Sequence, residues 1–247
     1  MKAILVLALC LCISISWAGC APSRSEPSQP QSPAVSISTV SEDVCAEDGT
    51  VIFTKTYPKI QITSAPESIA ADLQNRINVL LADAAELEAF AREDYAGQED
   101  WSPYFATIRV TAMRADQAVL SLYWEYSCFS GGNHPTLATQ SISYGTANGQ
   151  PLTLEELLED GYAPEQLSIL VNAALSPISA ELYDDYEATV GNLFYNSANG
   201  IQNWYLSEDG LCFHFAPYEI APYAKGVVSA TIPYSALREI LKAKYLI

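Results

Sequence analysis

The first half of the chain alternates between strand-like and helix-like hydrophobic patterns. The segment TVIFTKTYPKI alternates apolar and polar residues over positions 50–57 and predicts a strand. Ser64 and Glu67 then have the spacing of a capping box, with Pro66 in the first turn of the helix that it would begin. The next two alternating segments, within residues 105–129, predict a hairpin. Between the first strand and this hairpin, apolar residues at helical spacing predict a long amphipathic helix: Ile69, Leu73, Ile77, Leu80, Ala84, Leu87 and Ala91.

The second half mixes short strands and helices in the same way. A Gly-rich turn leads to a strand, and Thr153 and Glu156 form a capping-box pattern ahead of two helical stretches. Two strands about the Asp209-Gly210 pair come next, followed by another strand and a closing helix capped by Ser235. The pattern predicts an α+β fold of antiparallel sheets with helices packed on one face, divided into two small consecutive subdomains.

The N-terminal residues indicate an exported protein. Residues 1–19 have an early lysine, an apolar run and small residues at their end, as in a signal peptide. The segment WAGC resembles a bacterial lipobox in which Cys20 carries the lipid, although Trp17 stands where leucine is usual; ordinary cleavage after Ala18 is the alternative. Residues 20–41 are rich in Ser and Pro and predict a disordered tether. We expect a lipid anchor that holds the protein on the extracytoplasmic side of a bacterial cell membrane.

The charge balance narrows the choice of partners. The chain has 12 Lys and Arg residues and 29 Asp and Glu residues, which gives a net charge of −17 and a pI near 4.3. Nucleic acid would be repelled by this surface, as would an anionic membrane surface, so contact with the membrane is expected only through the lipid. The acidity serves either solubility alone or attraction to a cationic partner.

The cysteines suggest one disulfide and no metal site. If the signal peptide is removed and Cys20 is lipidated, Cys45, Cys128 and Cys212 remain for an oxidising compartment. We predict a disulfide between Cys45 and Cys128, which flank loops, and a buried thiol at Cys212, which lies in a strand. The chain has no C-x-x-C motif and only two histidines, which are far apart in the sequence, so neither a metal nor another cofactor is expected.

Three segments carry a resemblance to a known family. YSCFSGGNHP, YGTANGQPLTLEELL and WYLSEDGLCFHFAPYEIAPYAKGVVSATIPYSAL resemble, in order and spacing, the extracellular domain of the RsiV-like family. That family includes a lysozyme-sensing anti-sigma factor, and a related domain stands ahead of some peptidoglycan deacetylases. Residues 42–125 resemble the small α+β domain that often precedes it, which leaves residues 126–247 as the RsiV-like α+β domain. The resemblance implies lysozyme as a partner.

The resemblance also has limits. The anti-sigma factor has a sigma-binding segment and a membrane span, and the deacetylases have a separate catalytic domain. We expect this chain to lack both and to act as a non-catalytic binding module. The alternatives are a peptidoglycan-binding or accessory module and, more remotely, a hydrolase that uses carboxylates.

Little in the sequence supports a catalytic centre. The chain contains neither the G-x-S-x-G nor the H-E-x-x-H motif. His214 alternates with Leu211, Phe213 and Phe215, so we interpret it as a packed or strand-surface residue. The carboxylates Asp184, Asp185 and Glu187 resemble a glycosidase pair only in composition, and a helix surface explains them more simply.

The stretch FAPYEIAPYAKG, residues 215–226, is the best candidate for a binding loop. Pro217 and Pro222 fix φ, and Tyr218 and Tyr223 are rigid amphipathic side chains of the kind that anchor interfaces. Glu219 would add charge for a basic partner. The simpler alternative is a corner whose tyrosines pack on the closing helix. The turn with Gly131, Gly132 and His134 would join the same surface if the fold brought the two segments together.

Overall fold

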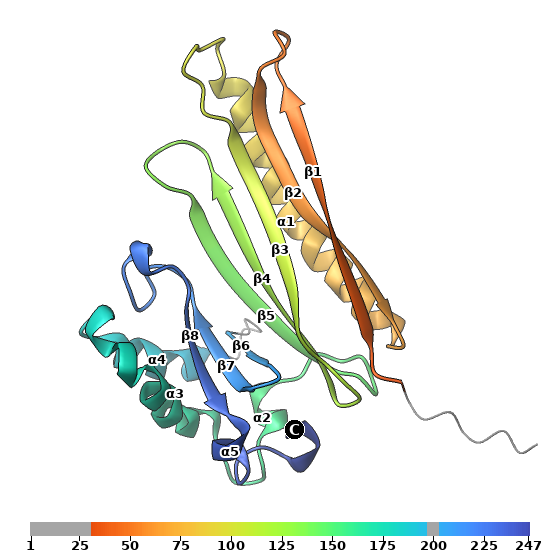
Figure 1. Ribbon diagram of the computed structural model, residues 1–247, viewed down its shortest axis with the longest axis vertical. Helices are drawn as coiled ribbons and strands as arrows, with labels where there is room; N and C mark the ends of the chain where they lie inside the picture. Colours follow the sequence, from red (N-terminus) through yellow and green to blue (C-terminus); the bar gives the residue numbers. More distant parts are fainter. Residues whose placement is uncertain (1–30, 197–202) are drawn as a thin grey trace, which may run out of the picture. The chain divides into compact units, whose positions relative to one another are not determined.

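The chain forms two β-sheets with helices packed against them (Figure 1). The computed structural model describes residues 31–196 and 203–247, so the predicted signal peptide, Cys20 and the first part of the predicted tether lie outside the described residues. The five-stranded sheet consists, in spatial order, of β1 (Ala34–Cys45), β2 (Val51–Thr63), β3 (Tyr104–Ala115), β4 (Val119–Phe129) and β5 (Thr136–Gly145). The three-stranded sheet consists of β6 (Trp204–Leu206), β7 (Gly210–Phe215) and β8 (Val228–Pro233).

The helices confirm the predicted α+β class. The α-helices are α1 (Glu67–Asp94), α2 (Leu154–Leu157), α3 (Leu167–Leu175), α4 (Tyr186–Asn196) and α5 (Tyr234–Leu237). Short 3₁₀ helices lie at η1 (Pro164–Gln166), η2 (Ser176–Glu181), η4 (Tyr223–Lys225) and η5 (Ala243–Tyr245). Among the described residues, no helix is both long and apolar enough to cross a bilayer.

Helix α1 packs its predicted hydrophobic stripe on the five-stranded sheet. Ile69 and Leu73 share a buried cluster with Leu122 of β4, while Ala84 packs with Phe53 of β2. The helix links β2 to β3, and these two strands therefore run parallel, whereas the other paired strands are antiparallel. One parallel pair thus departs from the predicted antiparallel pattern because a helix, and not a tight turn, makes the connection.

Strand β7 separates two environments, as its alternation predicts. Phe213 and Phe215 pack into the core that contains α3 and α4. His214 points the other way, toward Thr139 and Ser141 of β5. The three-stranded sheet therefore lies between the five-stranded sheet and these helices, with an apolar layer on one side and a polar layer on the other.

Arg114 joins the five-stranded sheet to the C-terminal segment. Its side chain is buried, and Nε donates to the Asp116 carboxylate at 2.6 Å. Nη1 donates to the Tyr234 hydroxyl and to the Tyr245 carbonyl, each at 2.6 Å. Strand β3 and the C-terminal segment are therefore connected by a buried polar contact.

Two predicted boundaries need correction. Residues 34–41, predicted as tether, form the first part of β1, because Val35 and Ile37 pair with apolar residues of β2. The predicted division between residues 125 and 126 falls inside β4, whose residues there pair with both β3 and β5. The hydrogen-bonded ladder continues to Gly145, so the five-stranded sheet does not end where the family resemblance places a boundary.

The predicted disulfide between Cys45 and Cys128 does not form. Cys45, Cys128 and Cys212 are all free thiols, and Cys212 is buried as predicted. Cys45 lies on β1 and Cys128 on β4, with two strands between them. Three strand spacings amount to about 14 Å, whereas a disulfide requires Cα atoms within about 7 Å.

Several helix ends differ from the sequence-based expectations. Ser64 adopts a positive φ of 60° and does not cap α1, which begins after Pro66 without a side-chain cap. The predicted closing helix stops at Leu237, because Leu241 forms a bridge with Leu158. The capping box of Thr153 and Glu156 is confirmed at α2.

Candidate functional site

The turn between β4 and β5 places His134 at one end of the five-stranded sheet. Gly131 and Gly132 have φ values of 91° and 93°, a conformation that strains residues with a side chain. A Cβ at Gly131 would meet the Tyr104 hydroxyl at 3.7 Å, an ordinary contact, so the positive φ and not a lack of space favours glycine there. The glycines therefore let the chain turn sharply before His134, which is the position expected from the sequence.

Internal hydrogen bonds hold the loop after β7 in shape. The Ala216 amide donates to Glu219 Oε2 at 2.7 Å, and the Glu219 amide donates to the Ala216 carbonyl at 3.1 Å. The Tyr218 amide donates to the Ala221 carbonyl at 3.0 Å. Burial raises the pKa of Glu219, while the hydrogen bond from the Ala216 amide opposes that rise. Glu219 thus fixes the loop, a role that sequence reasoning did not assign to it.

The same loop is anchored to the helical side of the molecule. Ile220 is fully buried, and its carbonyl accepts a hydrogen bond from the Tyr183 amide at 2.9 Å. Lys225 forms an ion pair with Glu181 of η2. Gly226 closes the loop with a φ of 71°. These contacts connect the loop that carries Tyr218 and Tyr223 to η2 and to the segment that follows it.

His134, Tyr218 and Tyr223 come together as one aromatic cluster, which we call the aromatic patch. The rings of His134 and Tyr223 are stacked, with centroids 3.9 Å apart and planes 21° apart. The Tyr218 ring lies 6.1 Å from His134 and 5.7 Å from Tyr223. The Tyr218 hydroxyl lies 3.1 Å from His134 Nε2, and His134 Nδ1 lies 2.9 Å from the Pro135 carbonyl. Two segments 84 residues apart therefore form one surface feature.

Tyr218 is exposed and has an unusual backbone conformation. Its side chain is 57% exposed, and its φ is 72°. A positive φ costs free energy in a residue with a side chain, and such strain is concentrated at functional sites. The loop thus holds an apolar ring in solvent at an energetic cost that its internal hydrogen bonds offset.

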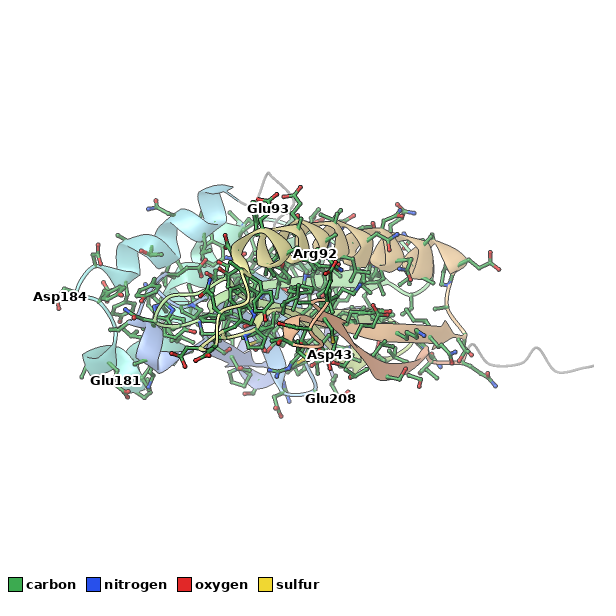
Figure 2. The ribbon with its side chains drawn as sticks, turned by 90° about the horizontal axis from the view of Figure 1, so that it is seen from above. Asp43, Arg92, Glu93, Glu181, Asp184 and Glu208 are labelled. Atoms are coloured by element: carbon green, nitrogen blue, oxygen red, sulfur yellow. The ribbon has the colours of Figure 1, made fainter. Side chains whose placement is uncertain are left out.

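Acidic side chains lie in the segment between η2 and α4, which contacts the loop after β7. Glu181 contacts the loop through Lys225, and Asp184 follows Tyr183, whose amide binds the loop. Figure 2 shows Glu181 and Asp184 projecting outward at one end of the molecule. Asp184, Asp185 and Glu187 are exposed; Glu187 lies on α4, as the helix-surface interpretation expects, whereas Asp184 and Asp185 lie in the turn before that helix.

A serine–histidine contact escaped the sequence analysis. Ser141 Oγ lies 2.9 Å from His214 Nε2, and Thr139 Oγ1 lies 3.0 Å from Nδ1. Ser141 and His214 are only 3% and 1% exposed, and Ser141 donates its proton to the Trp204 carbonyl at 2.7 Å. The hydroxyl therefore directs its proton away from the imidazole and is shielded from solvent, unlike the exposed nucleophile beside a base that hydrolysis requires.

Two further features of the described residues bear on chemistry. Residues 31–196 and 203–247 contain no group of three or more His, Cys, Asp or Glu side chains that would hold a metal ion. An open groove of about 500 Å³ lies where the β1–β2 turn meets the end of α1, lined in part by Cys45, Asp48, Arg92 and Tyr95. Its polar groups are engaged with one another or with neighbours, since Tyr95 donates to Asp48 and Arg92 pairs with Glu88.

Part of the chain is similar to a family of unknown function. Residues 155–235 match a family model described as "Protein of unknown function (DUF3298)". A crystal structure of a DUF3298 protein from Bacteroides fragilis has a TM-score of 0.54 at 18% identity, covering 87% of this chain and 96% of that one. A second, from Pseudomonas aeruginosa, has a TM-score of 0.54 at 17% identity, covering 88% and 97%. At these identities the likeness shows the fold alone.

Two curated relatives match about half of this chain. The immunogenic protein MPT64 of Mycobacterium tuberculosis is 25% identical over 145 residues, which are 52% of this chain and 53% of that protein. A protein named as an esterase from the same organism is 28% identical over 122 residues, 49% of this chain and 52% of its own length. The chain spans about half the length of these relatives. None of these matches identifies a catalytic family for this chain.

Proposed function

We propose that this chain is a lipid-anchored, extracytoplasmic binding module of the RsiV-like kind, which captures a cationic secreted protein. Lysozyme is the partner that the resemblance implies. The aromatic patch carries the proposal, because it joins the GGNHP turn and the FAPYEIAPYAKG loop, the two segments singled out as binding candidates. The family model covers the second segment and not the first.

The construction of the patch suits protein recognition. Tyrosine supplies a large contact area at low entropic cost, and tyrosines are enriched among the residues that dominate binding energy. Tyr218 and Tyr223 are already fixed by the loop hydrogen bonds and by the stack on His134, so little ordering free energy remains to be lost on binding.

The charge of the chain favours a basic partner. A net charge of −17 steers a cationic protein toward the surface. Such steering raises the association rate at low salt and weakens as the Debye length falls to about 8 Å near physiological ionic strength.

Binding kinetics on residues 31–247 test the proposal. The fragment should begin ahead of Ala34, because β1 belongs to the sheet. Lysozyme should bind the wild-type fragment with an association rate that falls as salt rises. Tyr218→Ala and Tyr223→Ala should raise the dissociation rate by about tenfold or more, which corresponds to about 1.4 kcal/mol. Melting temperatures of the same variants separate lost contacts from lost folding.

Tyr162→Ala is the matched control. Tyr162 is 39% exposed and lies outside the patch, so its replacement should leave binding unchanged. If the folded tyrosine variants of the patch bind as tightly as the wild type, the loop is a structural corner. Retention of the fragment on purified peptidoglycan, with no binding to lysozyme, would instead favour a cell-wall-binding module.

The anchor has its own test. Cys20→Ala removes the sulfur that would carry the lipid, so the protein should leave the membrane fraction or stay unprocessed. Globomycin, which blocks lipoprotein processing, should have a matching effect. Unchanged membrane association under both treatments would contradict lipidation at Cys20.

A further inference from the structure

The hydrogen bonds of His134 define which nitrogen carries its proton. The Pro135 carbonyl can only accept a hydrogen bond, so Nδ1, 2.9 Å away, must be the protonated nitrogen. In the neutral imidazole Nε2 is then an acceptor, and the Tyr218 hydroxyl donates to it across 3.1 Å. The phenol oxygen keeps its lone pairs directed outward, so the patch presents an acceptor to a ligand.

Protonation of His134 would reverse this arrangement. A second proton can be added only at Nε2, which then becomes a donor to the Tyr218 oxygen. The phenol hydrogen can no longer point at the imidazole and turns outward. One titration thus converts the outward face of Tyr218 from acceptor to donor and adds a positive charge to the patch.

We propose that His134 makes partner binding at the aromatic patch dependent on pH, with capture at neutral pH and release in acid. The consequence for the partner rests on the function proposed above, whereas the reversal of the hydrogen bond does not. A cationic partner brings N–H donors and positive charge. It is complementary to the acceptor face of Tyr218 at neutral pH and is opposed by both the donor and the imidazolium in acid.

The side chains around His134 are already engaged with neighbouring groups. From the loop, the Tyr223 ring covers one face of the imidazole and Tyr218 occupies Nε2. Glu219 accepts from the Ala216 amide, and Lys225 is paired with Glu181. The hydrogen bond between Tyr218 and His134 lies in an exposed environment, where an imidazolium can remain hydrated. Histidine is the side chain that ordinarily changes charge between pH 5 and 8.

Nitrogen-15 NMR of the imidazoles in the fragment 31–247 tests the reversal without any partner. The chain has two histidines, so His134→Gln assigns both sets of signals. At neutral pH, His134 should be protonated at Nδ1 and unprotonated at Nε2, and acid should add the proton at Nε2. Protonation at Nε2 in the neutral form, or absence of a His134 transition between pH 8 and 4.5, would overturn the proposal.

Dissociation of lysozyme at different pH values tests the consequence. The wild-type dissociation rate should rise at least fivefold between pH 7.5 and 5.5, and His134→Gln should abolish most of that rise. Glu219→Gln is the matched control, because burial raises the pKa of that nearby carboxyl; the rise should persist in it. Equal pH dependence in His134→Gln and the wild type would overturn the proposal. If lysozyme does not bind at all, the proposed partner is wrong, and the NMR titration alone decides the reversal.

Discussion

Replacement of Arg114 by methionine should strongly destabilise the protein, because it breaks the buried contact between β3 and the C-terminal segment. Methionine retains much of the apolar length of arginine but offers no donors. The guanidinium now serves three acceptors: the Asp116 carboxylate, the Tyr234 hydroxyl and the Tyr245 carbonyl. In the Arg114→Met variant each of these three acceptors would lose one hydrogen bond.

The structure sets the size of the effect. The Tyr245 carbonyl loses its bond to Arg114 in a buried environment, which costs about 1–3 kcal/mol. The Tyr234 hydroxyl still donates to the Ser207 carbonyl, so its loss is about 1 kcal/mol. The Asp116 side chain is 35% exposed and still accepts from backbone amides, which reduces its loss to about 1 kcal/mol. Together these terms predict a loss of about 3–5 kcal/mol in the free energy of unfolding.

Urea unfolding of residues 31–247 measures this loss. Arg109→Met is the matched control, because Arg109 also lies on β3 but is 74% exposed, and its pairing with Glu125 spans 3.9 Å. The control should change stability by less than about 1 kcal/mol. Similar losses in the two variants, or a loss below about 1 kcal/mol for Arg114→Met, would show that this contact does not hold β3 and the C-terminal segment together.

Three further predictions follow from burial and hydrogen bonding. In the native protein, iodoacetamide should modify Cys45, which is exposed, whereas Cys212 should react only after unfolding; mass spectrometry would contradict this if native Cys45 were protected. Burial acts to raise the pKa of Asp116, but hydrogen bonds from backbone amides and Arg114 outweigh it and hold that pKa below its ordinary value. The contribution of the Asp116 carboxylate to stability is therefore present at neutral pH and is lost as the pH falls through the lowered pKa. Asp116→Asn should flatten the acid limb of a plot of unfolding free energy against pH. An unchanged limb would contradict a lowered pKa for Asp116. Phe213→Ala should cost about 3–5 kcal/mol in urea unfolding, because the ring is 2% exposed in the core, and a loss under 1 kcal/mol would count against that packing.

Local signals in the sequence located much of the secondary structure. The stripe from Ile69 to Ala91 indicated α1, and the alternation around His214 indicated both faces of β7, because both patterns report directly which side of an element is buried. The capping box at Thr153 was equally local. The closing helix failed, because residues after Leu237 pair with a segment about 80 positions earlier in the chain, and no local propensity records such a pairing.

For the candidate site, the sequence was enough to locate the two segments that form it. Glycines and prolines specify backbone angles at single residues, so the GGNHP turn and the proline-rich loop could be identified as rigid and exposed segments. The long-range relations became clear only in the tertiary structure: His134 stacks on Tyr223, and Cys45 and Cys128 lie on strands too distant to bond. These relations depend on which strands neighbour one another across long stretches of chain. Strand order follows from the packing of whole sheets and helices, which patterns of three or four neighbouring residues do not encode.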